Sequence, residues 1–468
     1  MPEKKSVKKF LEEEEGVDFE SFRREVDRVD DKINATRYRE DNFDSEDGVL
    51  KGLPVSVKDN VCVKGMPATA GSRILESYRP EFTATVVRRL QENGGNVFAK
   101  TNMDEFGFGT FSTNSAYEVP RNPHDTDRVT GGSSGGAAAL TAALDSPHVA
   151  IGQSTGGSIS NPAAFCGAVG LTPTYGRVSR YGLIDYANSL DKLGPIADTV
   201  EDAAMVLDMI SGKDERDFTT VERDYEELSE VEGDVSGMRI GVPSQYMEFE
   251  GMDRKVRKKV WRSIKMLEDM GAEVEEVDMP RISKDYVMPS YYITAISEAS
   301  TNLARFCGMR YGLEGEPERK GFNQYFSEIR SQGFGKEAKR RVLLGHFARQ
   351  AGYREAYYLK ALKVRRMIIE EYKKAFREYD VLASPTMPMI APRFDEAEEL
   401  EPVEVYAMDT LTAGPNLAGL PQLSVPCGKV KGMPVGMHLL GGHFHERDIV
   451  AAGKAFENKF KGIRRPEL

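Results

Sequence analysis

Glycine is concentrated in the middle of the chain, and this constrains the fold more than any other feature of the sequence. Eleven glycines fall among the 52 residues from Gly131 to Gly182. The run GGSSGG, residues 131–136, leads directly into residues 137–144, whose small side chains predict a closely packed helix. Residues 149–152 predict a buried strand, which runs into a second loop, QSTGGS, at residues 153–158. Both loops therefore allow the backbone to approach other groups closely.

The flanking segments alternate between strand and helix patterns. Residues 53–57, LPVSV, predict a short strand just before Lys58; a helix at 83–93 and a strand at 96–100 follow. Further strands are predicted at 239–242, 273–277 and 381–383, and further helices at 199–210, 256–267 and 353–379. This alternation favours an α/β fold.

The chain divides into a polar N-terminal segment and one long domain. Residues 1–46 are polar and predict helical segments over the surface. Residues 47–460 contain neither an internal repeat nor a low-complexity linker, so we expect one compact domain. Its charged part, at about 215–350, is expected to be rich in insertions.

The composition excludes several classes of protein. The net charge is −11 and the pI is about 5.4, whereas a chain that binds nucleic acid by itself usually has a basic excess. No apolar run approaches the ~18 residues that a membrane helix needs, and a signal peptide is not evident, so we expect a cytoplasmic protein. The four cysteines are far apart, which favours free thiols over a zinc site or a disulfide framework.

Three residues are candidates for chemistry, although each has an ordinary structural interpretation. Lys58 follows a strand, where a lysine is more often solvated or salt-bridged. Ser133 and Ser158 lie in the two glycine loops, where serine is more often a turn or capping residue. A metal site at His443 and His445 would lack a third ligand, so none is expected.

Two familiar motifs fit the first glycine loop poorly. Residues 131–136 lack the G-K-[ST] ending of a phosphate-binding P-loop. Ser134 stands at the serine position of G-x-S-x-G, the nucleophile elbow of α/β-hydrolases. An elbow requires a strand before it, however, and residues 121–127 do not predict one.

Several longer stretches resemble the amidase signature family. They include GLPVSVKDN around Lys58, GGSSGG around Ser133 and STGGSISNPAAFCGAVG around Ser158, and the match extends over roughly residues 50–450. Within the family, NMDEF, GFGKE, KRR and NLAGLP are similar to glutamine-hydrolysing subunits of tRNA-dependent amidotransferases. The resemblance implies a mixed, predominantly parallel central sheet that is covered by helices on both sides.

The resemblance also implies a Ser–Ser–Lys triad. Ser158 would be the nucleophile, Lys58 the base, and Ser133, held by a cis peptide in this family, the bridge that relays the proton. A lysine can accept a proton only when it is neutral, so burial would have to lower its pKa. The backbone N–H groups of Thr155, Gly156, Gly157 and Ser158 would form an oxyanion hole.

Three further residues are expected, by the same resemblance, to bind the amino-acid head of glutamine. They are Tyr291 in PSYYITA, Arg341 in KRRVLLG and Asp409 in YAMDTLT. An arginine suits the α-carboxylate and an aspartate suits the α-ammonium, although surface salt bridges are the alternative interpretation.

The chain also departs from the family at three positions. Ser154 and Ser160 stand where an aspartate and an arginine are usual, and Thr172 stands where a lysine is usual. Because an acid and a base are lost together, no buried charge is left unpaired, and we expect the losses to compensate each other.

The expected function is glutamine hydrolysis through a glutamyl-serine ester. A B-type partner would use the ammonia, with ATP and Mg²⁺, to convert Glu-tRNA(Gln), and a small C-type partner would complete the complex. This chain would need no cofactor or metal of its own. A stand-alone amidase acting on another small amide and a non-catalytic scaffold subunit remain the alternatives.

Overall fold

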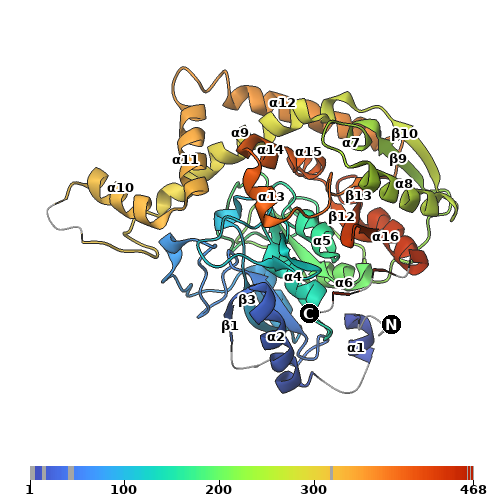
Figure 1. The fold of residues 1–468 in the computed structure, drawn as a ribbon, viewed down its shortest axis with the longest axis horizontal. Coiled ribbons are helices and arrows are strands. Elements are labelled where there is room, and N and C mark those ends of the chain that lie inside the picture. The colour runs from blue at the N-terminus through green and yellow to red at the C-terminus, as the bar shows by residue number, and fades with distance from the viewer. Residues whose placement is uncertain are drawn as a thin grey trace.

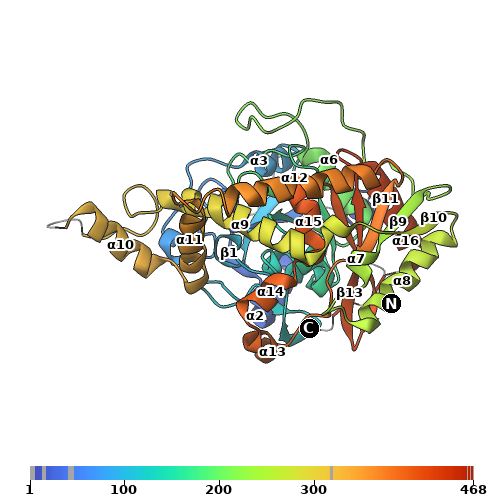
Figure 2. The same cartoon turned by 90° about the horizontal axis from the view of Figure 1, so that it is seen from above.

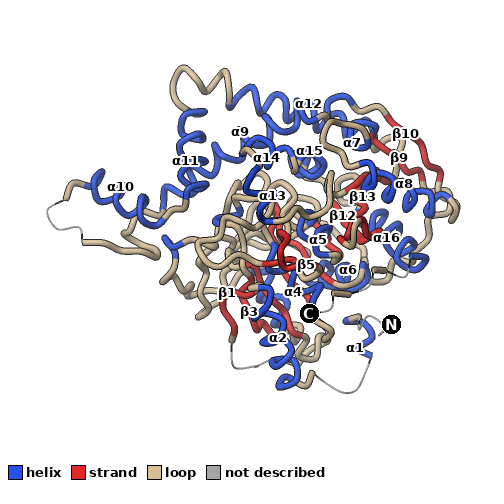
Figure 3. The backbone as a smooth tube through the Cα atoms, in the orientation of Figure 1, coloured by secondary structure: helices blue, strands red, loops and turns tan. Residues whose placement is uncertain are grey.

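A central sheet of eleven strands organises the computed structural model (Figure 1), which describes residues 6–12, 17–40, 47–316, 320–460, 462–463, 465–466 and 468. The strand order is β1-β3-β2-β6-β8-β7-β12-β13-β11-β9-β10. These strands are β1 (Thr36–Arg39), β2 (Pro54–Lys58), β3 (Asn96–Thr101), β6 (Val149–Ser154), β7 (Val169–Thr172), β8 (Lys192–Ala197), β9 (Arg239–Pro243), β10 (Glu273–Val277), β11 (Val381–Pro385), β12 (Gln422–Val430) and β13 (Met433–Gly441). Figure 3 shows the edge strands β1 and β10 at opposite ends of the molecule.

The sheet is mixed, as expected, but the expectation that it is predominantly parallel is wrong. Of its ten pairings in the described part of the chain, four are parallel and six are antiparallel. The antiparallel majority comes mostly from β7, β8, β12 and β13, which the strand patterns did not predict. The β12–β13 hairpin turns at Lys431 and Gly432, which both have positive φ.

Helices cover both faces of the sheet, as the side chains of β6 show. Val149 and Ile151 belong to one hydrophobic cluster and Ala150, between them, belongs to another, because successive strand residues point to opposite faces. The first cluster includes α3 (Thr85–Glu92), α6 (Val200–Ile210), α8 (Arg254–Glu268) and α16 (Glu446–Phe460); the other includes α2 (Phe19–Ile33), α4 (Gly135–Ala143) and α5 (Ser160–Cys166).

A third group of helices lies across the top of the molecule in Figure 1 and runs across the middle of Figure 2, which is seen from above. It contains α9 (Lys284–Asn302), α11 (Lys336–Arg349), α12 (Tyr358–Ala375) and α15 (Thr410–Ala418), while α10 (Phe322–Gly333) projects from the body. The shorter helices are α1 (Val7–Glu12), α7 (Ser244–Met247), α13 (Phe394–Glu399) and α14 (Pro402–Ala407). No described helix is long and apolar enough to cross a membrane.

Local sequence signals place several elements correctly. The Thr199 side chain accepts a hydrogen bond from the Asp202 N–H and caps α6, as its capping pattern predicted. The strands predicted at 239–242 and 273–277, within the charged region, add β9 and β10 to the central sheet. Two predictions are corrected: the described part of segment 1–46 contains an edge strand, β1, besides its helices, and residues 121–127 lie largely in a small hairpin, β4 (Arg121–Asn122) and β5 (Asp125–Val129).

Candidate active site

Lys58, Ser133 and Ser158 come from three separate segments that meet at the ends of neighbouring strands. Lys58 is the last residue of β2, and β6, its parallel neighbour, ends at Ser154, just before the loop that carries Ser158. Ser133 lies in the loop that leads into α4. Because parallel strands end at the same edge of a sheet, this topology brings Lys58 and the loop of Ser158 together.

The contact between Lys58 and Ser133 is direct and buried. Lys58 Nζ donates to Ser133 Oγ at 2.7 Å, and neither side chain is exposed to solvent. Burial lowers the pKa of Lys58 to about 7, although the carboxylates of Asp104 and Asp191 act in the opposite direction. A substantial fraction of this lysine is therefore neutral near neutral pH and able to accept a proton.

The two glycine loops are joined to each other by their backbones. The N–H of Ser134 donates to the carbonyl oxygen of Ser158 at 3.2 Å, and the peptide bond between Gly132 and Ser133 is cis. Ser158 remains 7% exposed, whereas Ser133 is fully buried.

Neither glycine that precedes Ser158 can carry a side chain. A Cβ at Gly156 would overlap the phenol of Tyr291, and one at Gly157 would overlap the hydroxyl of Thr412. Gly157 also has a φ of 155°, which residues with a side chain rarely adopt. The backbone of Thr155 to Ser158 is thus held in one path by close packing.

Arg341 lies on α11 in an aromatic enclosure. Its guanidinium lies 5.1–5.6 Å from the ring centres of four residues: Phe108, Tyr186, Tyr292 and Tyr406. Arg341 Nε donates to Glu337 Oε1 at 2.8 Å, and a second nitrogen donates to the Tyr186 hydroxyl. Arg341 is only 3% exposed, so the salt bridge that it makes with Glu337 is buried and does not lie on the surface.

Asp409 is a buried carboxylate that accepts three hydrogen bonds from uncharged groups. The donors are the Tyr292 hydroxyl at 2.9 Å, Thr110 Oγ1 at 3.0 Å and Asn161 Nδ2 at 2.8 Å. Burial raises the pKa of Asp409 to about 7. The Arg341 guanidinium lies over the ring of Tyr292, so this one tyrosine contacts both a cation and an acid.

The comparisons with known proteins agree with this geometry. A family model described as Amidase matches residues 24–450. The chain belongs to the amidase family. Among solved structures, it is similar to the crystal structure of the A subunit of glutamyl-tRNA(Gln) amidotransferase from Thermotoga maritima, with a TM-score of 0.85 and 38% identity over 99% of this chain and 97% of that one. A peptide amidase from Stenotrophomonas maltophilia gives a TM-score of 0.79 and 28% identity over 96% and 94% of the two chains.

Sequence relatives of this amidase have the same name as the first of those structures. The A subunit of glutamyl-tRNA(Gln) amidotransferase of Methanococcoides burtonii is 48% identical over 88% of this chain and 85% of the relative. Its counterpart of the same name in Halothermothrix orenii is 44% identical over 96% of this chain and 94% of the relative.

The three departures from the amidase pattern are buried. Ser154, Ser160 and Thr172 are each 0% exposed, and none of their hydroxyl oxygens has a hydrogen-bond partner among the described residues. Uncharged hydroxyls therefore occupy the positions for which compensating losses were expected.

Several residues of the site were not predicted from the sequence. Gln153 and Asp191 contact Lys58 or the nucleophile loop, and Asp104 accepts hydrogen bonds from the N–H groups of Ser112 and Asn114 beside the first loop. PSYYITA contains two adjacent tyrosines, and the sequence does not show which of them faces Asp409. In the structure it is Tyr292, and not Tyr291, whose hydroxyl donates to Asp409.

Ser134, the alternative nucleophile, is committed to structure in this amidase. Its hydroxyl donates to the carbonyl oxygen of Gln153 at 3.2 Å, and the residue is the N-cap of α4. A hydrolase elbow would also need a histidine partner, and His443 and His445 are engaged elsewhere, with the carbonyl of Ala418 and with Asp448. His438 is fully buried, and neither of its ring nitrogens has a hydrogen-bond partner among the described residues.

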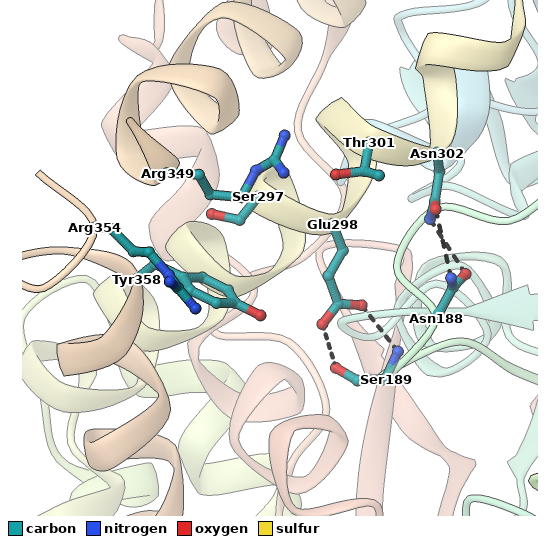
Figure 4. Close-up of a pocket in the computed structure, with 9 residues that line it drawn as sticks. All are labelled: Asn188, Ser189, Ser297, Glu298, Thr301, Asn302, Arg349, Arg354 and Tyr358. Atoms are coloured by element: carbon teal, nitrogen blue, oxygen red, sulfur yellow. Dashed lines mark hydrogen bonds between the residues drawn. The ribbon is translucent and has the colours of Figure 1, made fainter. Parts of the chain in front are cut away.

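A separate cleft of about 560 Å³ lies beside α9 and is lined in part by Asn188 and Ser189 (Figure 4). Glu298 accepts two hydrogen bonds from Ser189 there, while Arg349 and Arg354 line the opposite wall. Asn302, which also lines it, donates to the carbonyl of Tyr186. The cleft is thus connected through Asn302 to the backbone of Tyr186, whose side chain contacts Arg341.

Proposed function

We propose that this chain is the glutamine-hydrolysing A-type component of a glutamyl-tRNA(Gln) amidotransferase. The 2.7 Å contact between a buried lysine and a serine hydroxyl, next to the loop of a second serine, is the observation that carries an amidase mechanism. The relatives at 44–48% identity support the choice of substrate and reaction.

The chemistry begins with transfer of a proton. Neutral Lys58 removes the proton of Ser133 as Ser133 removes that of Ser158, and Ser158 Oγ attacks the side-chain amide carbon of glutamine. The C–N bond then breaks, and the same path returns a proton to the leaving nitrogen, so ammonia departs and a glutamyl ester remains on Ser158. Attack by water releases glutamate and regenerates the serine.

Backbone N–H groups would stabilise the negative charge that develops on the amide oxygen. Thr155, Gly156, Gly157 and Ser158 supply these donors, and the packing of Tyr291 and Thr412 against the two glycines keeps them in place. A preorganised donor of this kind is worth ~3 kcal/mol in comparable enzymes.

The amino-acid head of glutamine would occupy the space near Arg341, Asp409 and Tyr291. Arg341 would bind the α-carboxylate and Asp409 the α-ammonium, while Tyr291 would pack against both the substrate and Gly156. An α-ammonium would give Asp409 a cationic partner that its three uncharged donors do not supply, which is the physical reason to prefer a free amino acid over a neutral amide. Arg341 is already paired with Glu337 and would offer its remaining N–H donors to the α-carboxylate.

The ammonia would be used by a B-type partner, with a C-type partner completing the complex. ATP and Mg²⁺ would serve the B-type partner, and this chain would require no cofactor or metal. Because the chain is acidic, the B-type partner would also hold most of the tRNA, and the complex would act in the cytoplasm. We further propose that residues 47–460 form one amidase domain, to which the described part of residues 1–46 adds α2 and the edge strand β1.

Trapping the intermediate tests this function. The native complex is mixed with labelled glutamine, quenched in acid and digested, and the label should be found on Ser158. Ser158→Ala should lose at least ~10³-fold in glutaminase rate without a change in melting temperature, because only the nucleophile is removed. A label on another serine would contradict the assignment. Equal hydrolysis of varied amides by the isolated chain would support a stand-alone amidase, and an inactive wild-type complex would support a scaffold.

A further inference from the structure

We propose that Gln153 is a positioning residue that aims the lone pair of neutral Lys58 at Ser133, and that Asp191 fixes the orientation of Gln153. This inference rests on the proposed function of the triad. It concerns two residues that the triad itself does not include.

Gln153 supplies two of the three polar contacts that Lys58 Nζ makes in the described structure. The nitrogen donates to the backbone oxygen of Gln153 at 2.9 Å and to its side-chain oxygen, Oε1, at 3.2 Å. The third contact is Ser133 Oγ at 2.7 Å. A protonated lysine can therefore satisfy all three of its N–H bonds without any carboxylate in direct contact.

The same arrangement has a different consequence when the lysine is neutral. A neutral amine has two N–H bonds and one lone pair. If both oxygens of Gln153 accept these N–H bonds, the lone pair points toward the remaining neighbour, which is the Ser133 hydroxyl. Removal of the Ser133 proton requires this orientation, so Gln153 converts a buried amine into a directed base.

Asp191 decides which end of the Gln153 amide faces Lys58. The Gln153 Nε2 group donates to Asp191 Oδ1 at 3.0 Å and to Thr155 Oγ1 at 2.7 Å. Burial raises the pKa of Asp191 to about 7, but the hydrogen bonds that it accepts from Thr155 and from the Tyr186 N–H favour its ionised form. A carboxylate only accepts hydrogen bonds, so the NH₂ end must face Asp191 and the oxygen end must face Lys58. Asn60 Nδ2, which donates to the same Oε1 at 3.3 Å, favours the same orientation.

Asp191 is itself held in place and also reaches the nucleophile loop. Its second oxygen accepts from the backbone N–H groups of Tyr186 and Ala187 at 2.8 and 2.9 Å. Its first oxygen also accepts from Thr155 Oγ1 at 2.7 Å, at the start of the loop that carries Ser158. One buried carboxylate therefore fixes the base and the loop of the nucleophile relative to each other.

The first variant removes the amide but keeps the volume. Gln153→Met should lower the glutaminase kcat of the native complex by about 10- to 100-fold, in line with the contribution of a positioned base. The KM for glutamine should stay within about twofold, because Arg341 and Asp409 are untouched. The matched control is Gln422→Met, which alters another fully buried glutamine, on β12, and should keep the wild-type kcat.

The second variant moves the charge without removing the hydrogen bonds. In the double variant Gln153→Glu/Asp191→Asn, an amide at 191 donates to a carboxylate at 153, which then lies against Lys58 Nζ. The other charged groups that act on Lys58 are Asp104, which is unchanged, and Asp191, which is neutralised. The acidic limb of the pH–rate profile should move to higher pH by about one unit or more, because a nearer carboxylate favours the protonated lysine.

Each outcome decides the proposal. Glutaminase rates are compared only among complexes that still use external ammonia to amidate tRNA. Such complexes are folded and assembled, so a change in rate comes from the glutaminase site. A wild-type kcat for Gln153→Met, or an unmoved pH limb in the double variant, would overturn the role of Gln153. If glutamine is instead hydrolysed by Ser158→Ala and Lys58→Arg, it is the triad that fails, so the two failures are distinguishable.

Discussion

The ends of β2 and β3 provide two buried lysines with different surroundings. Lys58 and Lys100 lie on neighbouring strands, both are 0% exposed, and burial lowers the pKa of each. Lys100 Nζ donates to the carbonyl oxygens of Val61 and Pro67 at 2.5 and 3.2 Å and lies 3.9 Å from Asp59. Lys58, in contrast, donates to a hydroxyl.

The difference shows that burial alone does not create a base. The contacts of Lys100 are with carbonyl and carboxylate oxygens, so this lysine cross-links the loop that follows β2 and does not face a hydroxyl. Ser133 has a proton to give, and therefore Lys58 can take part in catalysis. The two lysines form a matched pair in which the same substitution should have different effects.

Replacement of each lysine by arginine is expected to have the largest effect. Lys58→Arg should reduce glutaminase activity by about 10³-fold or more, because arginine stays charged at any working pH and cannot act as the base. Lys100→Arg should retain activity and instead lose about 1–3 kcal/mol of stability through overpacking. Single-turnover glutamine hydrolysis and thermal melting of both variants measure this. Equal loss of activity in the two variants would remove the distinction.

The Ser133→Ala variant tests whether the Ser133 hydroxyl is what distinguishes the surroundings of Lys58 from those of Lys100. Without it, Lys58 is surrounded by acceptors only, as Lys100 is. Acylation of Ser158 should slow by about 10²- to 10³-fold, within the usual contribution of general acid–base catalysis. The rate of label incorporation into Ser158 measures this step. A near-normal rate would exclude Ser133 from the proton path.

Arg341→Ala leaves both lysines intact and removes a proposed substrate contact. A charge-assisted contact contributes about 1.5–3 kcal/mol, so the requirement for glutamine should rise about tenfold or more. External ammonia bypasses the glutaminase site, and its use should not change. The measurement is tRNA amidation by the whole complex with each nitrogen donor. Equal loss with both donors would assign Arg341 to folding or to an interface with a partner.

The smallest expected effect is on the pH dependence. Since the pKa of Lys58 is about 7 and only its neutral form is a base, kcat for glutamine should fall as pH decreases through 7. The quantity to follow is kcat, because kcat/KM also reports the free Asp409 carboxyl, whose pKa is about 7 as well. Between pH 8 and pH 6 the neutral fraction changes about tenfold, and the rate should follow it. Lys100→Arg should leave this limb where it is. A limb that moves in the Lys100 variant would show that the pair is coupled.

The sequence by itself determined the local features of this protein. Alternating patterns located β2, β3, β6, β9, β10 and β11, and the capping pattern at Thr199 located the start of α6. The two glycine loops and their serines were also evident, because close backbone approach requires glycine and the requirement is visible in the sequence. The resemblance to amidases supplied the grouping of Lys58, Ser133 and Ser158.

Only the tertiary structure decided the features that depend on distant contacts. The antiparallel pairing of β12 with β7 joins segments about 250 residues apart, and no local pattern specifies such a partner. Lys58 and Lys100 look alike in the sequence, since each follows a short apolar strand. Their difference comes from Ser133 and Gln153, which lie 75 and 95 residues from Lys58. The protonation chemistry of a buried group is set by its neighbours in space, and those neighbours are fixed only when the sheet and both loops have assembled.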